Sequence, residues 1–420
     1  MNCMPRPISR AELLAVLLVI AAAMFTGLSA VPFHPDESHW IGLSAPFEAF
    51  VAGRFTDPIW QERQDKATNG TITYYVIGAA RRAGGFTPDR LNLPWRWFEP
   101  HEVNLAEGRV PEPRLLWWGR AGVTSAAIGG IFVIFILWRR AAGRPAAYLW
   151  LALVLVNPYL RLVLRRAMNE GVLLLLLALA AWAASRALPH VDRPAGAPGA
   201  RRRAFAWLVA AAVAAGLAAQ TKLNGSLAVP GMMVAAALAA VRSPLGWGGR
   251  IRRAGLAGLL LAAVSFATFV GTNPSMWPDP IRDSVRSLRA RAQTVRAQLL
   301  RPGARQLDGA PGRARIVATR VFSDYALVPL PVAGPILFLI GSGLAGAGLL
   351  GWLRRANEND ALVLLVIIGA GVSVPMLFTP LDWERYYFLP VFFFGLPTVM
   401  GAEWLARRAW RPLSAARSGK

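Results

Sequence analysis

The stretch AELLAVLLVIAAAMFTGLSAVPFHPDESHW, residues 11–40, decides the fold class. It begins with an almost uncharged run of about twenty residues, the length that an α-helix needs to cross the hydrocarbon of a membrane. Two adjacent acids, Asp36 and Glu37, follow where this helix is expected to leave the membrane. Arg6 and Arg10 precede the run as in a signal peptide, but the run length and the poor cleavage site SAVPFHPDE favour a retained first span.

The rest of the chain has the composition of a multi-spanning helical membrane protein. Of its 420 residues, 55% are hydrophobic and 16% are charged, and the mean hydropathy is +0.39. Soluble domains of this size rarely have such a composition. The net charge of +23 would suit nucleic-acid binding, but the basic residues flank apolar runs as membrane topology demands, which argues against a nucleic-acid partner. Cys3 is the single cysteine, so no internal disulfide is possible.

About ten apolar runs predict membrane-spanning helices. They are residues 11–31, 115–138, 146–164, 171–186, 204–219, 223–241, 254–272, 332–353, 361–380 and 386–406. With the N-terminus placed inside, the inner connections and tails are short and rich in Arg, as the positive-inside rule expects, and both long loops fall outside. We therefore expect an all-α polytopic protein of the inner (plasma) membrane with both termini in the cytoplasm.

The two long outer loops define the expected organisation. It comprises the N-tail and first span (1–31), a first outer loop with the acids and interfacial helices (32–114), spans two to seven (115–272), a second outer loop (273–331), and the last three spans with a basic cytoplasmic tail (332–420).

One segment of the second outer loop, IRDSVRSLRARAQTVRAQLL at residues 281–300, has the pattern of an amphipathic helix. Its apolar stripe consists of Ile281, Val285, Leu288, Ala292, Val295 and Leu299, and arginines cover the other faces. Such a helix lies in the membrane interface with its arginines near lipid phosphates, or it packs on the rest of its own protein. The sequence leaves both interpretations open.

Ionisable residues gather in the outer turns, whereas the middles of the spans contain almost none. The turns are HPDE (34–37), NPYLRLVLRRAMNEG (157–171), QTKLNGS (220–226), TNPSMWPDP (272–280) and PLDWERYYFLP (380–390). Transporters keep charged residues near the bilayer midplane. The distribution therefore favours an enzyme that meets substrate head groups at the outer surface. The alternatives are a lipid-glycan flippase or transporter, or an envelope-assembly subunit without catalysis.

The acids and bases of these turns suggest two chemical roles. Asp36 and Glu37 could accept a proton from an attacking hydroxyl, or could cap a helix that begins at ESHWIGL. Lys222, Arg165 and Arg385 could neutralise a phosphate on a leaving group.

Other polar residues of the turns have plainer interpretations. Arg161 and Arg166 are interpreted as arginines that reach toward lipid head groups, and His34 and His39 as local hydrogen-bonding residues. A divalent cation is possible if Asp36 and Glu170 approach each other, and no other cofactor is expected.

In their order these motifs resemble the GT-C glycosyltransferase superfamily, over roughly residues 10–400. The shared features are the acid pair after the first span, the long first outer loop, TYYVIG (73–78), the Arg-rich turn that ends in an acid, TKLNG (221–225), NPSMWPDP (273–280) and ERYYFLP (384–390). The most similar branch is the protein O-mannosyltransferase and aminoarabinose-transferase group, which uses polyprenyl-phosphate sugars. The segment KATNGTITYY (66–75) departs from that branch, where a Pro-rich segment precedes the tyrosine pair.

The resemblance implies a role for each matching residue. Asp36 corresponds to the general base, Glu37 to its neighbour, and Glu170 to an acid that binds the acceptor or a metal. The residues linked with the lipid phosphate or with substrate binding are Lys222, Arg385, Tyr386 and Tyr74. The implied reaction is inverting transfer of a sugar from a polyprenyl-phosphate donor to a hydroxyl of a protein, lipid or glycan, at the outer (periplasmic) face of the membrane.

Overall fold

The structure, a computed structural model, describes residues 8–60, 70–192, 199–300, 309–328, 330, 332–354, 359–379 and 381–417. Over these ranges eight helical segments are long and apolar enough to cross a membrane, or nine if one bent pair is counted as a span. The long helices are α1 (Arg10–Phe25, continued by the 3-10 turn η1, Leu28–Ala30), α7 (Pro113–Ala142), α10 (Glu170–Asp192), α11 (Ala200–Thr221), α12 (Ala228–Arg242), α13 (Trp247–Gly271), α16 (Ala333–Leu353) and α19 (Phe388–Arg417). The protein is therefore an all-α, multi-pass membrane protein.

The two remaining predicted spans are helical but interrupted. The run at 146–164 forms α8 (Arg144–Val156) and α9 (Pro158–Arg165), which are bent by 70°. The bend is local in origin, because Asn157 caps α9 by accepting a hydrogen bond from the Leu160 N–H and Pro158 begins it. The run at 361–380 gives the 14-residue helix α17 (Asp360–Ser373) and the short α18 (Pro375–Phe378). A helix of this length falls short of the ~20 residues of a full span, so the expected count of about ten is reduced.

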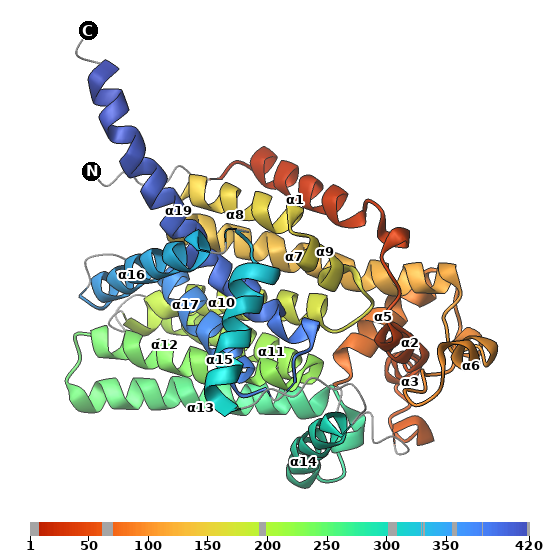
Figure 1. Ribbon diagram of the computed structural model, residues 1–420. Helices are drawn as coiled ribbons and strands as arrows, with labels where there is room; N and C mark the ends of the chain where they lie inside the picture. Colours follow the sequence, from red (N-terminus) through yellow and green to blue (C-terminus); the bar gives the residue numbers. More distant parts are fainter. Residues whose placement is uncertain are drawn as a thin grey trace.

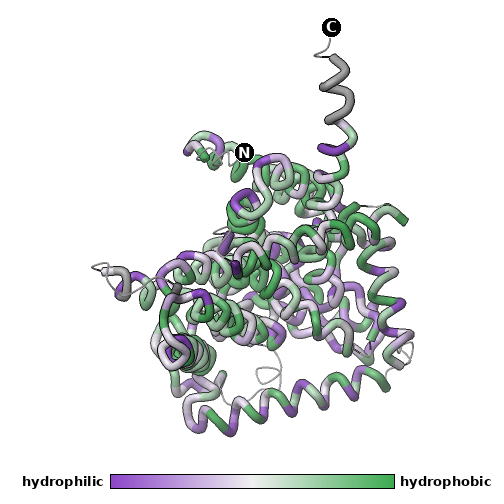
Figure 2. Tube along the Cα trace, turned by 90° about the vertical axis from the view of Figure 1, so that its left-hand side faces the viewer, coloured by the Kyte–Doolittle hydropathy of each residue, from purple (hydrophilic) through white to green (hydrophobic). Residues whose placement is uncertain are grey.

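Helices α7 and α10 form the centre of the bundle, and most of their side chains are buried. They pack against each other, and α10 also packs along α11 (Figure 1). By contrast, only 22%, 28% and 22% of the residues in the apolar stretches of α1, α13 and α16 are buried, although these helices are strongly apolar. Hydrophobic residues dominate the bundle in Figure 2. An apolar helix with exposed apolar side chains is what contact with lipid requires, so these three helices form the perimeter.

Two glycines bring the backbones of α16 and α19 into direct contact. A Cβ built on Gly341 would lie 1.7 Å from the Pro397 carbonyl oxygen, and one built on Gly401 would lie 2.1 Å from the Leu337 carbonyl oxygen. Small residues permit this close approach, which is how membrane helices gain packing energy without a hydrophobic driving force.

The connections between the spans carry the short helices. In the first outer loop these are α2 (Pro35–Gly42), α3 (Pro46–Val51), η2 (Pro58–Trp60), α5 (Ile72–Ala83), η3 (Pro88–Arg90) and α6 (His101–Ala106). Later connections contain η4 (Leu223–Leu227), η5 (Pro274–Met276), α14 (Pro280–Leu299), α15 (Gly309–Thr319), the π-turn η6 (Arg320–Asp324) and η7 (Glu384–Tyr387). The start of α1 and the end of α19 lie on one side of the bundle, and α2, α3 and α6 lie on the opposite side (Figure 1).

The predicted amphipathic helix is α14, the lowest helix in Figures 1 and 2. The first half of its apolar stripe is open: Ile281, Val285 and Leu288 are 66%, 41% and 59% exposed. In the second half, Ala292 and Val295 line a cavity described below. The apolar stripe is therefore open in the first half of the helix and faces the cavity in the second half.

Replacing Gly341 by Ala should destabilise the bundle. The new methyl group would overlap the Pro397 carbonyl, so α16 and α19 must separate, at a cost of about 1–3 kcal/mol. Gly343→Ala on the same helix is the matched control, because a Cβ there meets nothing within 4 Å. The thermal unfolding midpoint in detergent should fall for Gly341→Ala alone; equal midpoints for both variants would contradict the packing argument.

Candidate functional site

A buried ion pair holds the beginning of the first outer loop against the bundle. The Arg120 Nε and Nη2 atoms of α7 each lie 2.8 Å from an oxygen of Glu37 on α2. The exposed fractions of these side chains are 1% for Arg120 and 0% for Glu37. Arg120 also donates to the carbonyls of Leu28 (3.2 Å) and Val31 (2.8 Å), at the end of the first span. A charge so deeply buried requires such a full set of partners.

Glu37 also connects α2 to the segment that joins α9 and α10. Its Oε1 accepts a hydrogen bond from the Ala167 N–H at 2.9 Å, and its Oε2 accepts one from the His34 N–H at 3.0 Å. The His34 Nδ1 in turn accepts from the Asp36 N–H at 3.1 Å. The helix thus begins at Pro35 with His34 as its N-cap, two residues earlier than the acid-capped start at ESHWIGL that the sequence suggested.

The neighbouring acid, Asp36, points the other way, into a cavity of about 1270 Å³. We call it the polar cavity. Its walls come from α2, the segment 94–97, the α9–α10 connection (166–169), the α11–α12 connection (221–224), α14, α18 and the turn 382–386. Its volume exceeds the ~300–1,000 Å³ of typical small-molecule pockets. The cavity can therefore hold two substrates or part of a lipid.

Ion pairs line this cavity. The Arg385 Nη1 donates to the Asp36 Oδ2, the Lys222 Nζ donates to the Glu170 Oε1 at 3.1 Å, and Arg166 lies 3.8 Å from Glu384. Lys222 and Arg385 both lie over the Tyr386 ring, with Nζ and Cζ 5.8 Å from its centroid. These acids thus compensate the charges of Arg385, Lys222 and Arg166.

The structure brings together most, but not all, of the residues that the sequence singled out. Asp36, Lys222, Arg385 and Tyr386 line the polar cavity, and the buried Glu170 (1% exposed) adjoins it through Lys222.

The other three candidates lie elsewhere in the part of the chain that the structure describes. Glu37 is bound by Arg120, Arg165 donates to the Thr26 carbonyl at the end of the first span, and Tyr74 packs on Trp40 with ring centroids 4.7 Å apart. These contacts are structural ones.

Three cavity arginines were missed by sequence reasoning. Arg166 had been interpreted as reaching toward lipid, yet it lines the polar cavity beside Glu384. Arg291 and Arg296 come from α14, where the regular arginine pattern gave no reason to separate them from their neighbours. The one available signal was the apolar stripe, because Ala292 and Val295 of that stripe face the same cavity.

The donor set of the cavity does not fit a divalent cation. Asp36 and Glu170, which would have to converge on the ion, are each occupied by a basic side chain. Among the described residues no group of three or more His, Cys, Asp or Glu side chains could hold a metal. Basic side chains at this position suit an anion such as phosphate instead.

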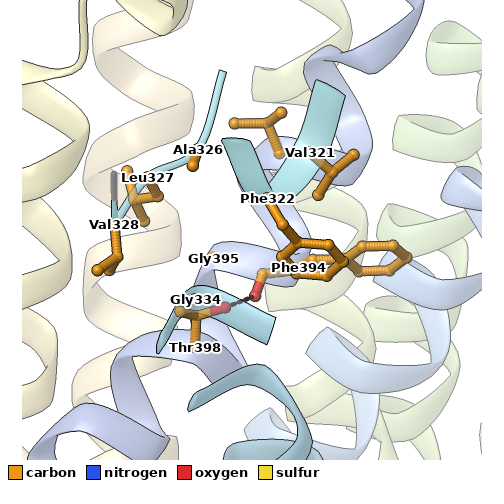
Figure 3. Close-up of a pocket in the computed structure, with 10 residues that line it drawn as sticks. Val321, Phe322, Ala326, Leu327, Val328, Gly334, Phe394, Gly395 and Thr398 are labelled. Atoms are coloured by element: carbon orange, nitrogen blue, oxygen red, sulfur yellow. Dashed lines mark hydrogen bonds between the residues drawn. The ribbon is translucent and has the colours of Figure 1, made fainter. Parts of the chain in front are cut away.

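A second, much smaller pocket lies between η6 and α19 (Figure 3). Its described walls are apolar, apart from Thr398, whose hydroxyl donates to the Phe394 carbonyl at 2.8 Å. It offers no charged or titratable side chain among those residues and is a packing gap.

The fold is that of the GT-C glycosyltransferases, as the order of motifs predicted. ArnT from Cupriavidus metallidurans in the apo state superposes with a TM-score of 0.55 and 18% identity, over 96% of this chain and 61% of that one. Its complex with undecaprenyl phosphate superposes with a TM-score of 0.53 and 18% identity, over 96% of this chain and 62% of that one. The Archaeoglobus fulgidus oligosaccharyltransferase, tethered to an acceptor peptide with the NVT sequon, superposes with a TM-score of 0.51 and 12% identity, over 98% of this chain and 51% of that one.

The chain thus spans between about half and three fifths of the length of these proteins. No family model matches the sequence, and no curated protein matches it significantly. At this level of identity the likeness defines the fold, and function has to be argued from the cavity.

Removing the charge of Glu37 should unfold the region around the cavity. Glu37→Gln leaves Arg120 buried with its charge uncompensated, which typically costs about 3–5 kcal/mol. The control is Glu102→Gln on α6, an exposed position where the change should stay within about 0.5 kcal/mol. Thermal unfolding in detergent compares the two, and a Glu37→Gln midpoint equal to that of the control would show that the ion pair adds no stability.

The His34 cap makes stability depend on pH. Burial, and then the charges of Arg166 and Arg385, lower the pKa of His34 from 6.5 to about 4. Since the folded pKa is the lower one, the stabilisation is complete above pH 6.5 and is lost as the pH falls from 6.5 toward 4. His34→Asn keeps a capping acceptor that does not titrate, so its unfolding midpoint should fall less over this range. Parallel curves for the two proteins would contradict the low pKa.

Proposed function

We propose that the chain is a membrane glycosyltransferase that moves a sugar from a polyprenyl-phosphate carrier to a hydroxyl acceptor, with Asp36 as general base. The observation that carries the proposal is the convergence of Asp36, Lys222, Arg385 and Tyr386, from three separate connections, on one cavity. The fold relative ArnT has been seen with undecaprenyl phosphate, and Lys and Arg are suited to the phosphate of such a carrier.

The ion pairs in the cavity suggest how a donor would start the reaction. A carrier phosphate that binds Lys222 and Arg385 competes with Glu170 and Asp36 for them. Asp36 is then released from its arginine and can take a proton from the acceptor hydroxyl. The hydroxyl oxygen attacks the anomeric carbon, the bond from that carbon to the phosphate oxygen breaks, and the charge on the departing phosphate is stabilised by Lys222 and Arg385.

In this mechanism Glu37 positions the base and does not take part in the chemistry. Its carboxylate is held by Arg120 and by two backbone N–H groups, which fixes α2 and hence the direction of Asp36. Glu170 would bind the acceptor while Lys222 holds the phosphate, or would pair with Lys222 again after the carrier departs.

The alternation of spans supports a site on the outer face of an inner (plasma) membrane, with cytoplasmic termini. The connections that line the cavity are the ones that the positive-inside rule assigns to the outside. A flippase remains the second candidate function, but its charged groups would be expected within the spans, and those of the polar cavity belong to the connections and helix ends.

Asp36→Asn should lower the rate of sugar transfer by about 10²–10⁴-fold, the usual contribution of a general base, without changing the unfolding midpoint by more than a surface substitution does. Mass spectrometry of envelope lipids and glycans follows the reaction in cells. Cells with the variant, like cells without the chain, should accumulate lipid-linked sugar and lose a glycan product.

A charge exchange tests whether the ion pair between Asp36 and Arg385 is by itself sufficient for activity. Asp36→Arg combined with Arg385→Asp restores an ion pair of reversed direction and leaves no carboxylate at position 36. The exchanged protein should be folded and inactive. Recovery of transfer in it would show that Asp36 serves only to hold Arg385.

A further inference from the structure

Helix α14 forms one wall of the polar cavity and brings two arginines into it. Its residues in the lining are Arg291, Ala292, Thr294, Val295, Arg296 and Gln298. Arg291 is half-buried, whereas Arg296 is exposed. The other arginines of the helix, among them Arg282 and Arg286, are not part of this wall in the described structure. The helix therefore presents two of its positive charges to the site and the others to its surroundings.

The charges on α14 are uncompensated, unlike those elsewhere in the cavity. Lys222, Arg385 and Arg166 each lie beside an acid. The acid Asp382, which also lines the cavity, is taken by Arg320, whose Nε lies 3.1 Å from its Oδ1. Within the described ranges, neither Arg291 nor Arg296 has a carboxylate at ion-pair distance. The cavity thus has two surplus positive charges, and both lie on one wall.

Arg291 lies next to the groups proposed to hold the carrier phosphate. Its Nη2 donates to the Tyr386 hydroxyl at 3.4 Å, and Lys222 and Arg385 lie over the ring of the same tyrosine. Three cations from three parts of the chain therefore surround one side chain. A second anion bound by Arg291 would be adjacent to the first, as the two phosphates of a diphosphate are.

A buried amide on the same wall also points to a ligand. The Gln298 side chain is 8% exposed, and its Oε1 is buried without a hydrogen-bond partner in the described chain. Buried polar atoms are nearly always paired. A ligand hydroxyl in the cavity would supply the missing donor.

We propose that Arg291 and Arg296 form a second phosphate subsite and that the sugar carrier is a polyprenyl diphosphate. This inference rests on the proposed function and specifies its donor. A sugar joined to a diphosphate carries one more negative charge than a sugar joined to a monophosphate, and the second phosphate would lie against the uncompensated arginines of α14. In the transfer, the bond from the anomeric carbon to the diphosphate oxygen breaks and its electron pair stays on that oxygen. The acceptor oxygen forms the new bond, and its proton goes to Asp36.

The test compares undecaprenyl diphosphate with undecaprenyl phosphate as ligands of the full-length protein in lipid nanodiscs, by competition in native mass spectrometry. The diphosphate should bind at least about tenfold more tightly, the effect of one additional charge-assisted contact. Arg291→Gln with Arg296→Gln should remove this difference and leave the affinity for the monophosphate within about twofold. Arg282→Gln with Arg286→Gln, the same charge change at exposed positions of α14, should retain the difference.

The possible failures are distinguishable. Equal binding of both lipids by the wild-type protein, an equal loss of both in the Arg291 and Arg296 variant, or the same result in the control variant would overturn the second subsite. If the monophosphate binds with dependence on Lys222 while the diphosphate has no advantage, this inference fails and the proposed function stands. If neither lipid binds, the proposed function fails as well.

Discussion

The arrangement of the site depends on the ion pair between Glu37 and Arg120. It is the point at which the end of the first span, the start of α2 and the α9–α10 connection are all tied to the central helix α7. A buried pair of this kind adds little net stability compared with apolar packing, but the loss of one partner is costly. The ion pair instead fixes the orientation of α2. With Glu37 held against Arg120, the preceding residue, Asp36, points into the polar cavity.

Charge balance is the second constraint on the cavity. The cations of the connections are neutralised by acids of the same cavity, so the protein avoids several uncompensated charges close to the membrane. In the proposed function an anionic substrate is recognised by exchange of partners, and the carboxylate of Asp36 is released from Arg385 when that substrate binds. The wall formed by α14 differs, since its arginines have no such internal partners in the described chain.

The sequence predicted most membrane helices, but it did not predict the orientation of every side chain near the polar cavity. Apolar runs of span length identified the membrane helices, and alternation of sides correctly grouped Asp36, Lys222, Arg385 and Tyr386. The division of the run at 361–380 into two helices could not be predicted, because Pro375 begins a new helix within a continuous apolar stretch. The separate tasks of Asp36 and Glu37 could not be predicted either, since they depend on which side of α2 meets Arg120. Arg166 and Arg291 were indistinguishable in sequence from arginines that face lipid.

The contact between Asp36 and Arg385 joins residues 349 positions apart. One belongs to the first connection of the chain and the other to the last. During synthesis on the ribosome, this contact can form only after Arg385 and the apolar helix α19 that follows it have been made. The turn 382–386 therefore joins the walls of the polar cavity only after the walls made by the earlier connections.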